Sequence, residues 1–194
     1  MKRNKERMII IRAFIGIDFP DEIKNNILKL QQSLRRYALK GRWKYVDNFH
    51  LTLKFLDKIN ISQKEKLDEA MKTMVRSMEP FSLWISGLGI FESRNSIRVL
   101  WVGLSGEILK LKTLQKNIDS LLKPIGFQPE KRSYTPHITI GQDILLEQDF
   151  NEIKAKIGKP KFSPIIVENL YLFKSEQIQN KRVYTKVSEY KLSL

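Results

Sequence analysis

The 194-residue chain contains no cysteine and only two histidines. Without thiols, neither a disulfide, a thiolate zinc site nor a cysteine nucleophile is available. Long apolar runs are also missing: the stretch from Met8 to Ile17 is interrupted by Arg12 and is followed by no small-residue cleavage site. This stretch therefore predicts a first strand and not a signal peptide or a membrane span. We expect a monomeric cytoplasmic protein with no membrane contact.

Acidic residues are scarce relative to basic ones. The chain has 35 Lys and Arg against 21 Asp and Glu, which gives a formal net charge of +14. A charge of this size favours an anionic partner, and RNA or DNA is the obvious class. The apolar fraction of 42% is ordinary for a folded protein, so the charge excess does not imply disorder.

Both histidines stand in the same four-residue frame. Residues 50–53 and 137–140 each read His, apolar, Thr, apolar. In a strand this order places His and Thr on one face and the aliphatic side chains on the other. Thr occurs at only six positions, so Thr two residues after both histidines has a chance probability of roughly one in a thousand. The duplicated frame therefore indicates function.

Two imidazoles and two hydroxyls that converge on one anion suit acid–base chemistry on a phosphate ester. One imidazole deprotonates a nucleophile and the other protonates the leaving oxygen. Thr52 and Thr139 would donate hydrogen bonds to the non-bridging phosphate oxygens, where charge accumulates in the transition state. The two histidines lie far apart in sequence and no carboxylate cluster accompanies them, so we expect no metal site.

The spacing of apolar residues predicts an α+β protein. Helices are predicted from Pro20 onward and over 62–78, 106–123 and 147–157; strands are predicted over 8–18, 42–46, 49–56, 81–91, 97–104, 135–142, 162–173 and 182–187. The histidines are 87 positions apart and the helices that follow them begin 85 apart, which indicates a duplicated unit. We expect one domain over 1–194, built from two pseudo-symmetric lobes that each carry an antiparallel sheet and helices beside a central cleft. Ser62 and Glu65 form the expected capping box of the second helix.

Several segments resemble one known family. Residues 12–20 (Arg-Ala-Phe-Ile-Gly-Ile-Asp-Phe-Pro) are similar to its opening strand, and residues 49–56 (Phe-His-Leu-Thr-Leu-Lys-Phe-Leu) to its first signature. Residues 136–140 (Pro-His-Ile-Thr-Ile) are similar to its second signature. The chain thus resembles the two-histidine phosphoesterases, and among them the RNA 2′,3′-cyclic phosphodiesterases, also called 2′-5′ RNA ligases.

This resemblance implies a bilobal LigT-like fold and a metal-independent enzyme without a cofactor. It implies that the substrate is RNA with a 2′,3′-cyclic phosphate end, tRNA fragments among them, and that the product carries a 2′-phosphate. A 2′-phosphate product means that the 3′-oxygen leaves, and the resemblance implies that His50 is the general acid and His137 the general base.

Three further residues complete the expected substrate site. Lys54 shares the face of His50 if the strand alternates regularly, and Phe14 is an aromatic residue that could contact substrate. Gln142 replaces the arginine that the family usually has after its second motif, so a charged phosphate contact is missing there. We expect Gly141 to bend the strand and to bring Gln142 to the cleft edge.

Two other functions remain open at this stage. A 2′-5′ RNA ligase would use the same chemistry with an RNA hydroxyl in place of water. A non-catalytic protein that binds RNA ends would retain the anion pocket but would not need both histidines.

Overall fold

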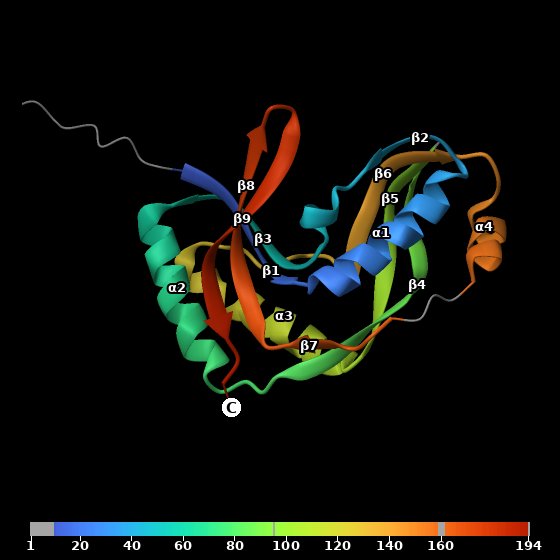
Figure 1. Ribbon diagram of the computed structural model, residues 1–194. Coiled ribbons are helices and arrows are strands. Elements are labelled where there is room, and N and C mark those ends of the chain that lie inside the picture. Colours follow the sequence, from blue (N-terminus) through green and yellow to red (C-terminus); the bar gives the residue numbers. More distant parts are fainter. Residues whose placement is uncertain (1–9, 95, 159–161, 194) are drawn as a thin grey trace, which may run out of the picture.

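The residues that the structure describes form two antiparallel sheets with helices beside them (Figure 1). The computed structural model describes residues 10–94, 96–158 and 162–193. The first sheet has the strand order β3-β1-β8-β9 and the second β2-β6-β5-β4-β7. The strands are β1 (Ile10–Asp18), β2 (Ala38–Trp43), β3 (His50–Asn60), β4 (Phe81–Ser93), β5 (Ser96–Gly106), β6 (His137–Leu146), β7 (Ile165–Val167), β8 (Asn169–Ile178) and β9 (Lys181–Lys191). The expected α+β class with two antiparallel lobes is confirmed.

In the described part of the chain, four α-helices cover the outer faces of the sheets. They are α1 (Asp21–Arg35), α2 (Ile61–Val75), α3 (Ile108–Leu122) and α4 (Phe150–Ile157), and two short 3₁₀ turns cover Val46–Asn48 and Lys123–Ile125. Helices α2 and α3 contact β3, and α2 also contacts β9, whereas α1 contacts β6 and α4 (Figure 1). Each lobe therefore has one face packed against helices and one face free of them, as a half-buried antiparallel sheet requires.

The apolar stripe of α1 shows how sequence periodicity positions a lobe. Ile23, Ile27 and Leu34 recur at helical spacing and are buried. Gln31, on the same side, donates through Nε2 to the backbone oxygens of Lys44 and Ile140, each at 2.8 Å. A buried amide with both donors satisfied fixes α1 to the strand of the second motif.

The start of α2 differs from the expectation. The helix begins at Ile61, and its capping box is formed by Asn60 and Gln63 instead of Ser62 and Glu65. Both pairs have the required spacing, but the backbone of Asn60 is extended while Ser62 already lies inside the helix.

Each sheet combines strands from both halves of the chain. The first sheet takes β1 and β3 from the N-terminal half and β8 and β9 from the C-terminal end. The predicted strand over 162–173 is divided: β7 pairs with β4 in the second sheet, and β8 pairs with β1 in the first. The chain crosses between lobes at Glu168, whose carbonyl accepts a hydrogen bond from the Leu192 N–H at 2.8 Å.

Candidate active site

The two His-apolar-Thr-apolar motifs lie on strands of different sheets that contact each other. The first motif opens β3 and the second opens β6, and these two strands touch across the lobes. Leu51 and Ile138 are fully buried, whereas the four His and Thr side chains remain half-buried on the opposite strand face. The Tyr134 hydroxyl donates to the Thr52 carbonyl at 2.9 Å and so links the loop before the second motif to the first motif.

The imidazoles are held in the same way in both motifs. The Nδ1 atom of His50 lies 2.8 Å from the Asn48 carbonyl, and that of His137 lies 2.7 Å from the Thr135 carbonyl. A carbonyl can only accept, so Nδ1 carries the hydrogen in both rings and Nε2 is the reactive nitrogen. The Thr52 hydroxyl lies 3.0 Å from Nε2 of His50 and donates to it while that imidazole is neutral.

Asn48 anchors the carbonyl that orients His50. Its side chain is 6% exposed, and its Nδ2 donates to the Arg182 carbonyl on β9 at 2.8 Å. The first histidine is therefore oriented through a residue fixed to a distant strand of the same sheet. This contact spans 134 sequence positions, and no local sequence pattern could reveal it.

Aromatic rings surround both histidines. The His50 ring centroid lies 4.6 Å from that of Phe14, and the His137 centroid lies 5.0 Å from Phe91 and 6.0 Å from Trp101. These rings replace water around the imidazoles. They disfavour the charged imidazolium, which needs solvation.

This burial changes the protonation of the site. Desolvation lowers the pKa of His50 to about 4, and the positive charge of Lys44 acts in the same direction, against the raising effect of the Asn48 carbonyl. Desolvation also lowers the pKa of His137, against the raising effect of the Thr135 carbonyl. At neutral pH the free enzyme thus holds two uncharged imidazoles, and in each of them Nε2 is the nitrogen without a hydrogen.

Phe14 is almost fully buried, and a direct contact of its ring with substrate stays a prediction. Its side chain is 3% exposed, because it lies between the His50 ring and Phe173, whose centroid is 4.9 Å away. The aromatic residue that faces solvent is Phe55, which pairs with Phe14 in the β1–β3 ladder and is 72% exposed. Phe14 therefore supports His50, and Phe55 presents the open ring.

A β-bulge explains Phe55 and also corrects the expected face of Lys54. In the β1–β3 ladder, Gly16 pairs with Thr52 and Ile15 with Lys54, so Leu53 has no partner. One extra residue reverses the alternation beyond that point. Lys54 consequently turns toward the helix-covered face, with a side chain 4% exposed.

The charge of Lys54 is used inside the protein. Its ammonium group pairs with the Asp119 carboxylate on α3 and donates to the Gln128 carbonyl at 2.9 Å. Gln115 donates to the second carboxylate oxygen at 2.9 Å. Lys54 borders the cavity described below, but its positive charge is already neutralised there.

The second motif has a bulge at the equivalent place. In the β5–β6 ladder, Trp101 pairs with Thr139 and Leu100 with Gly141, so Ile140 is unpaired. The bend was expected at Gly141, but the extra residue of the bulge is Ile140. It places the half-buried Gln142 on the face of His137 and Thr139, next to Val99 of β5 and Arg42 of β2. A contact of Gln142 with phosphate stays a prediction.

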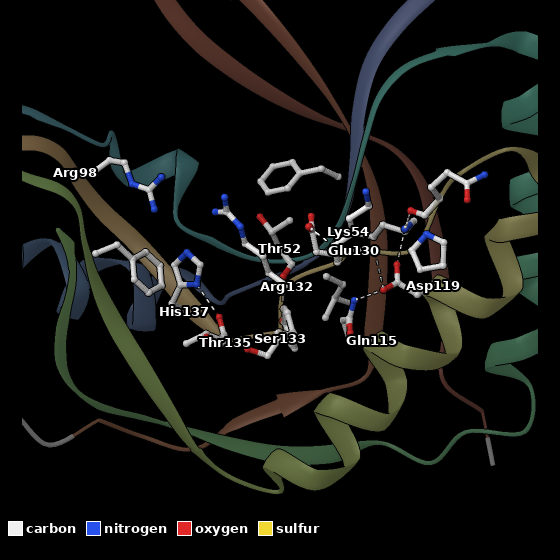
Figure 2. Close-up of a pocket in the computed structure, with 17 residues that line it drawn as sticks. Thr52, Lys54, Arg98, Gln115, Asp119, Glu130, Arg132, Ser133, Thr135 and His137 are labelled. Carbon is white, nitrogen blue, oxygen red and sulfur yellow. Dashed lines mark hydrogen bonds and ion pairs between the residues drawn. The ribbon is translucent and has the colours of Figure 1, made fainter. Parts of the chain in front are cut away.

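A cavity of about 870 Å³ joins the two motifs. Thr52 from the first motif and His137 from the second both line it, together with Phe55. Arg98 on β5 and Arg132 in the loop before β6 also line it, and Figure 2 shows their guanidinium groups turned toward the part of the cavity beside His137. Neither arginine belongs to a recognisable motif: the sequence gives no signal for Arg98, and it indicates for the Lys131-Arg132 pair only a solvated loop that flanks the cleft.

The cavity carries no obvious metal-binding set. Within the residues that the structure describes, no three His, Cys, Asp or Glu side chains come together as ligands. Among the helices of the described residues, none is both long and apolar enough to cross a membrane.

Comparison with known proteins identifies consistent relatives. The family described as LigT-like phosphoesterase matches the chain twice, over residues 17–101 and 102–184. The RNA 2′,3′-cyclic phosphodiesterase of Methanocaldococcus jannaschii is 32% identical over 183 residues, which cover 93% of this chain and 100% of that protein. The protein of the same description from Aquifex aeolicus is 28% identical, with 95% and 99% covered.

The fold has solved counterparts. The crystal structure of E. coli LigT complexed with 3′-AMP superposes with a TM-score of 0.81 at 24% identity, and the match covers 96% of this chain and 100% of that one. A structure described as that of a phosphoesterase gives 0.80 at the same identity and coverage. These two structures establish the bilobal fold.

Proposed function

The chain belongs to the LigT-like phosphoesterase family, and we propose that it hydrolyses 2′,3′-cyclic phosphate ends of RNA to 2′-phosphates. The observation that carries this proposal is the duplicated imidazole geometry. In each motif Nδ1–H is bound by the carbonyl two residues earlier, which leaves Nε2 as the reactive nitrogen. Relatives described as RNA 2′,3′-cyclic phosphodiesterases supply the substrate class.

In the proposed reaction a water oxygen attacks phosphorus while the bond from phosphorus to O3′ breaks. Nε2 of His137 takes the proton of the attacking water, and Nε2–H of His50 protonates O3′. The 2′-oxygen keeps the phosphate. Thr52 and Thr139 donate their hydroxyl hydrogens to the non-bridging oxygens as charge builds on them.

The acid must acquire a proton that the empty site does not hold. Burial keeps His50 neutral at pH 7, but an anionic phosphate beside Nε2 favours the imidazolium and raises the pKa of His50. When Nε2 is protonated, the Thr52 oxygen can accept from it and the Thr52 hydroxyl hydrogen can turn to the phosphate. Substrate binding thus prepares the acid.

Cations near the phosphate would support this change. Arg98 on β5 and Arg132 in the loop before β6 both line the cavity. Guanidinium groups bind phosphate oxygens in a bidentate manner. They would compensate for the neutral Gln142 at the position where the family usually has an arginine.

The proposal extends to the setting of the enzyme. One chain contributes both histidines and both threonines, so a monomer is sufficient for activity. We place the enzyme in the cytoplasm, with tRNA fragments that end in a cyclic phosphate among its substrates.

One assay separates this function from the alternatives. Purified protein is incubated with EDTA and an oligoribonucleotide that ends in a 2′,3′-cyclic phosphate, with and without a second RNA that carries a 5′-hydroxyl. Hydrolysis to a 2′-phosphate is expected in both mixtures. Joined RNA as the main product would identify a ligase; unchanged RNA that remains bound would identify a non-catalytic binder. Activity that EDTA abolishes and added metal restores would contradict the two-histidine mechanism.

A further inference from the structure

A second cavity of about 360 Å³ adjoins the catalytic one on the His50 side. Phe55 lines both cavities, so its ring stands between them. The second cavity is formed on the helix-free face of the first sheet, by Arg12 and Phe14 of β1, Phe55 of β3, and Ser175, Arg182 and Tyr184 of the β8–β9 hairpin. None of the acid–base groups lines it.

Aromatic rings make up the wall nearest the catalytic groups. Phe55 is 6.2 Å from Phe14 between ring centroids and keeps most of its surface in solvent. Tyr184 lies edge-on at 5.0 Å from both Phe14 and His50. Phe55 lies on β3, the edge strand of the first sheet, and most of its ring is not used for packing. A nucleobase of any identity can stack on such a ring.

The charged side chains that line the second cavity are Arg12, Arg182 and Asp57. Arg12 pairs with Asp57 at 3.0 Å, and both side chains remain mostly exposed. Across residues 10–94, 96–158 and 162–193, the Arg182 side chain takes part in no ion pair. The cavity therefore carries a net positive charge, in a protein of formal charge +14.

We propose that this second cavity binds the nucleotide on the 5′ side of the cyclic-phosphate nucleotide. Its base stacks on Phe55, and the adjoining phosphate lies against Arg182 and Arg12. An RNA end with a cyclic phosphate has a neighbour only on this side, so one extra subsite is sufficient. The inference rests on the proposed function, and it makes the enzyme selective for RNA chains over cyclic mononucleotides.

The test compares a nucleoside 2′,3′-cyclic phosphate with a dinucleotide that ends in the same group. Arg182→Gln should lower kcat/KM for the dinucleotide about tenfold and leave the mononucleotide within twofold. Phe55→Ala should lower the ratio of dinucleotide to mononucleotide kcat/KM by about tenfold, since one stacked base contributes about 1–3 kcal/mol. Phe55→Tyr should restore the ratio. Arg76→Gln, at the exposed end of α2, is the matched control and should change neither substrate.

Binding measured without turnover distinguishes a failure of the proposed subsite from a failure of the proposed hydrolysis. The affinities for a nucleoside 2′-phosphate and for a labelled dinucleotide 2′-phosphate are measured at several salt concentrations. Arg182→Gln should reduce the salt slope for the dinucleotide by about 0.7, the value for one single-strand phosphate contact. Equal effects of Arg182→Gln on both ligands, or an equal loss with Arg76→Gln, would overturn the subsite. A wild-type protein that binds both ligands but hydrolyses neither substrate would overturn only the proposed reaction.

Discussion

The protonation of His50 is the property that most directly tests the site, because burial holds it far from the ordinary value. The pKa falls from 6.5 to about 4. At 1.36 kcal/mol for each pH unit, this difference corresponds to about 3 kcal/mol of lost solvation of the imidazolium. In the empty protein His50 should therefore stay neutral through the whole physiological range.

The chain is well suited to a direct measurement, since it has only two histidines. Their ring signals are followed by NMR from pH 3 to 8, and the variant His137→Gln assigns them. The signal of His50 should titrate near pH 4, and that of His137 should titrate below 6.5 because burial lowers its pKa as well. Addition of a nucleoside 2′-phosphate should move both transitions to higher pH, since an anion favours the imidazolium.

The same shifts set the kinetic profile. kcat/KM reports the free enzyme, in which both pKa values are lowered, and so its optimum should lie below pH 6.5. kcat reports the complex with an anionic substrate, so its optimum should lie at higher pH than that of kcat/KM. The rising and falling limbs of each pH profile report the histidine pair as a unit, so they do not by themselves identify which histidine is the acid. A His50 signal that titrates near 6.5 in the empty protein, or coincident optima, would refute the argument from burial.

Three further predictions concern single side chains. His50→Ala and His137→Ala should each lower kcat by at least about 10²-fold, and the double variant should be little worse, because acid and base act as one unit. Gln142→Arg should lower KM about fivefold with little change in kcat, which corresponds to about 1 kcal/mol for one added phosphate contact. Asp119→Asn should lower the free energy of unfolding in urea by about 3 kcal/mol or more, because it leaves the Lys54 ammonium buried without its counter-charge.

Each of these predictions has a control or a contrary outcome. Asp143→Asn removes the exposed partner of Arg42. It should lower the free energy of unfolding by less than about 1 kcal/mol, in contrast to Asp119→Asn. Equal losses for the two Asn variants would contradict the importance of burial. Near-normal turnover of either single histidine variant would exclude the acid–base pair. An unchanged KM in the folded Gln142→Arg variant would show that Arg98 or Arg132 already supplies the phosphate contact.

The sequence predicted the features that repeat at a regular period. The duplicated His and Thr frame, the strand character of both motifs and the amphipathic helices all depend on alternation or helical spacing within a few residues. The family resemblance extended these to the bilobal fold. Residues whose role depends on partners distant in sequence were not predictable in this way. Lys54 pairs with Asp119, which is 65 positions away in the sequence, and Asn48 binds the Arg182 carbonyl, which is 134 positions away.

The two bulges explain why the expectations for Lys54 and Gly141 were wrong, and they connect the fold to specificity. Leu53 and Ile140 are the fourth residues of their motifs, and each lacks a partner in the ladder with the neighbouring strand. Because each bulge adds one residue, the side chain three positions after the Thr returns to the reactive face. In the first motif that residue is Phe55, an open ring, and in the second it is Gln142, a neutral amide. Both identities can therefore change substrate preference without disturbing the histidines, which lie on the regular part of the strands before the bulge.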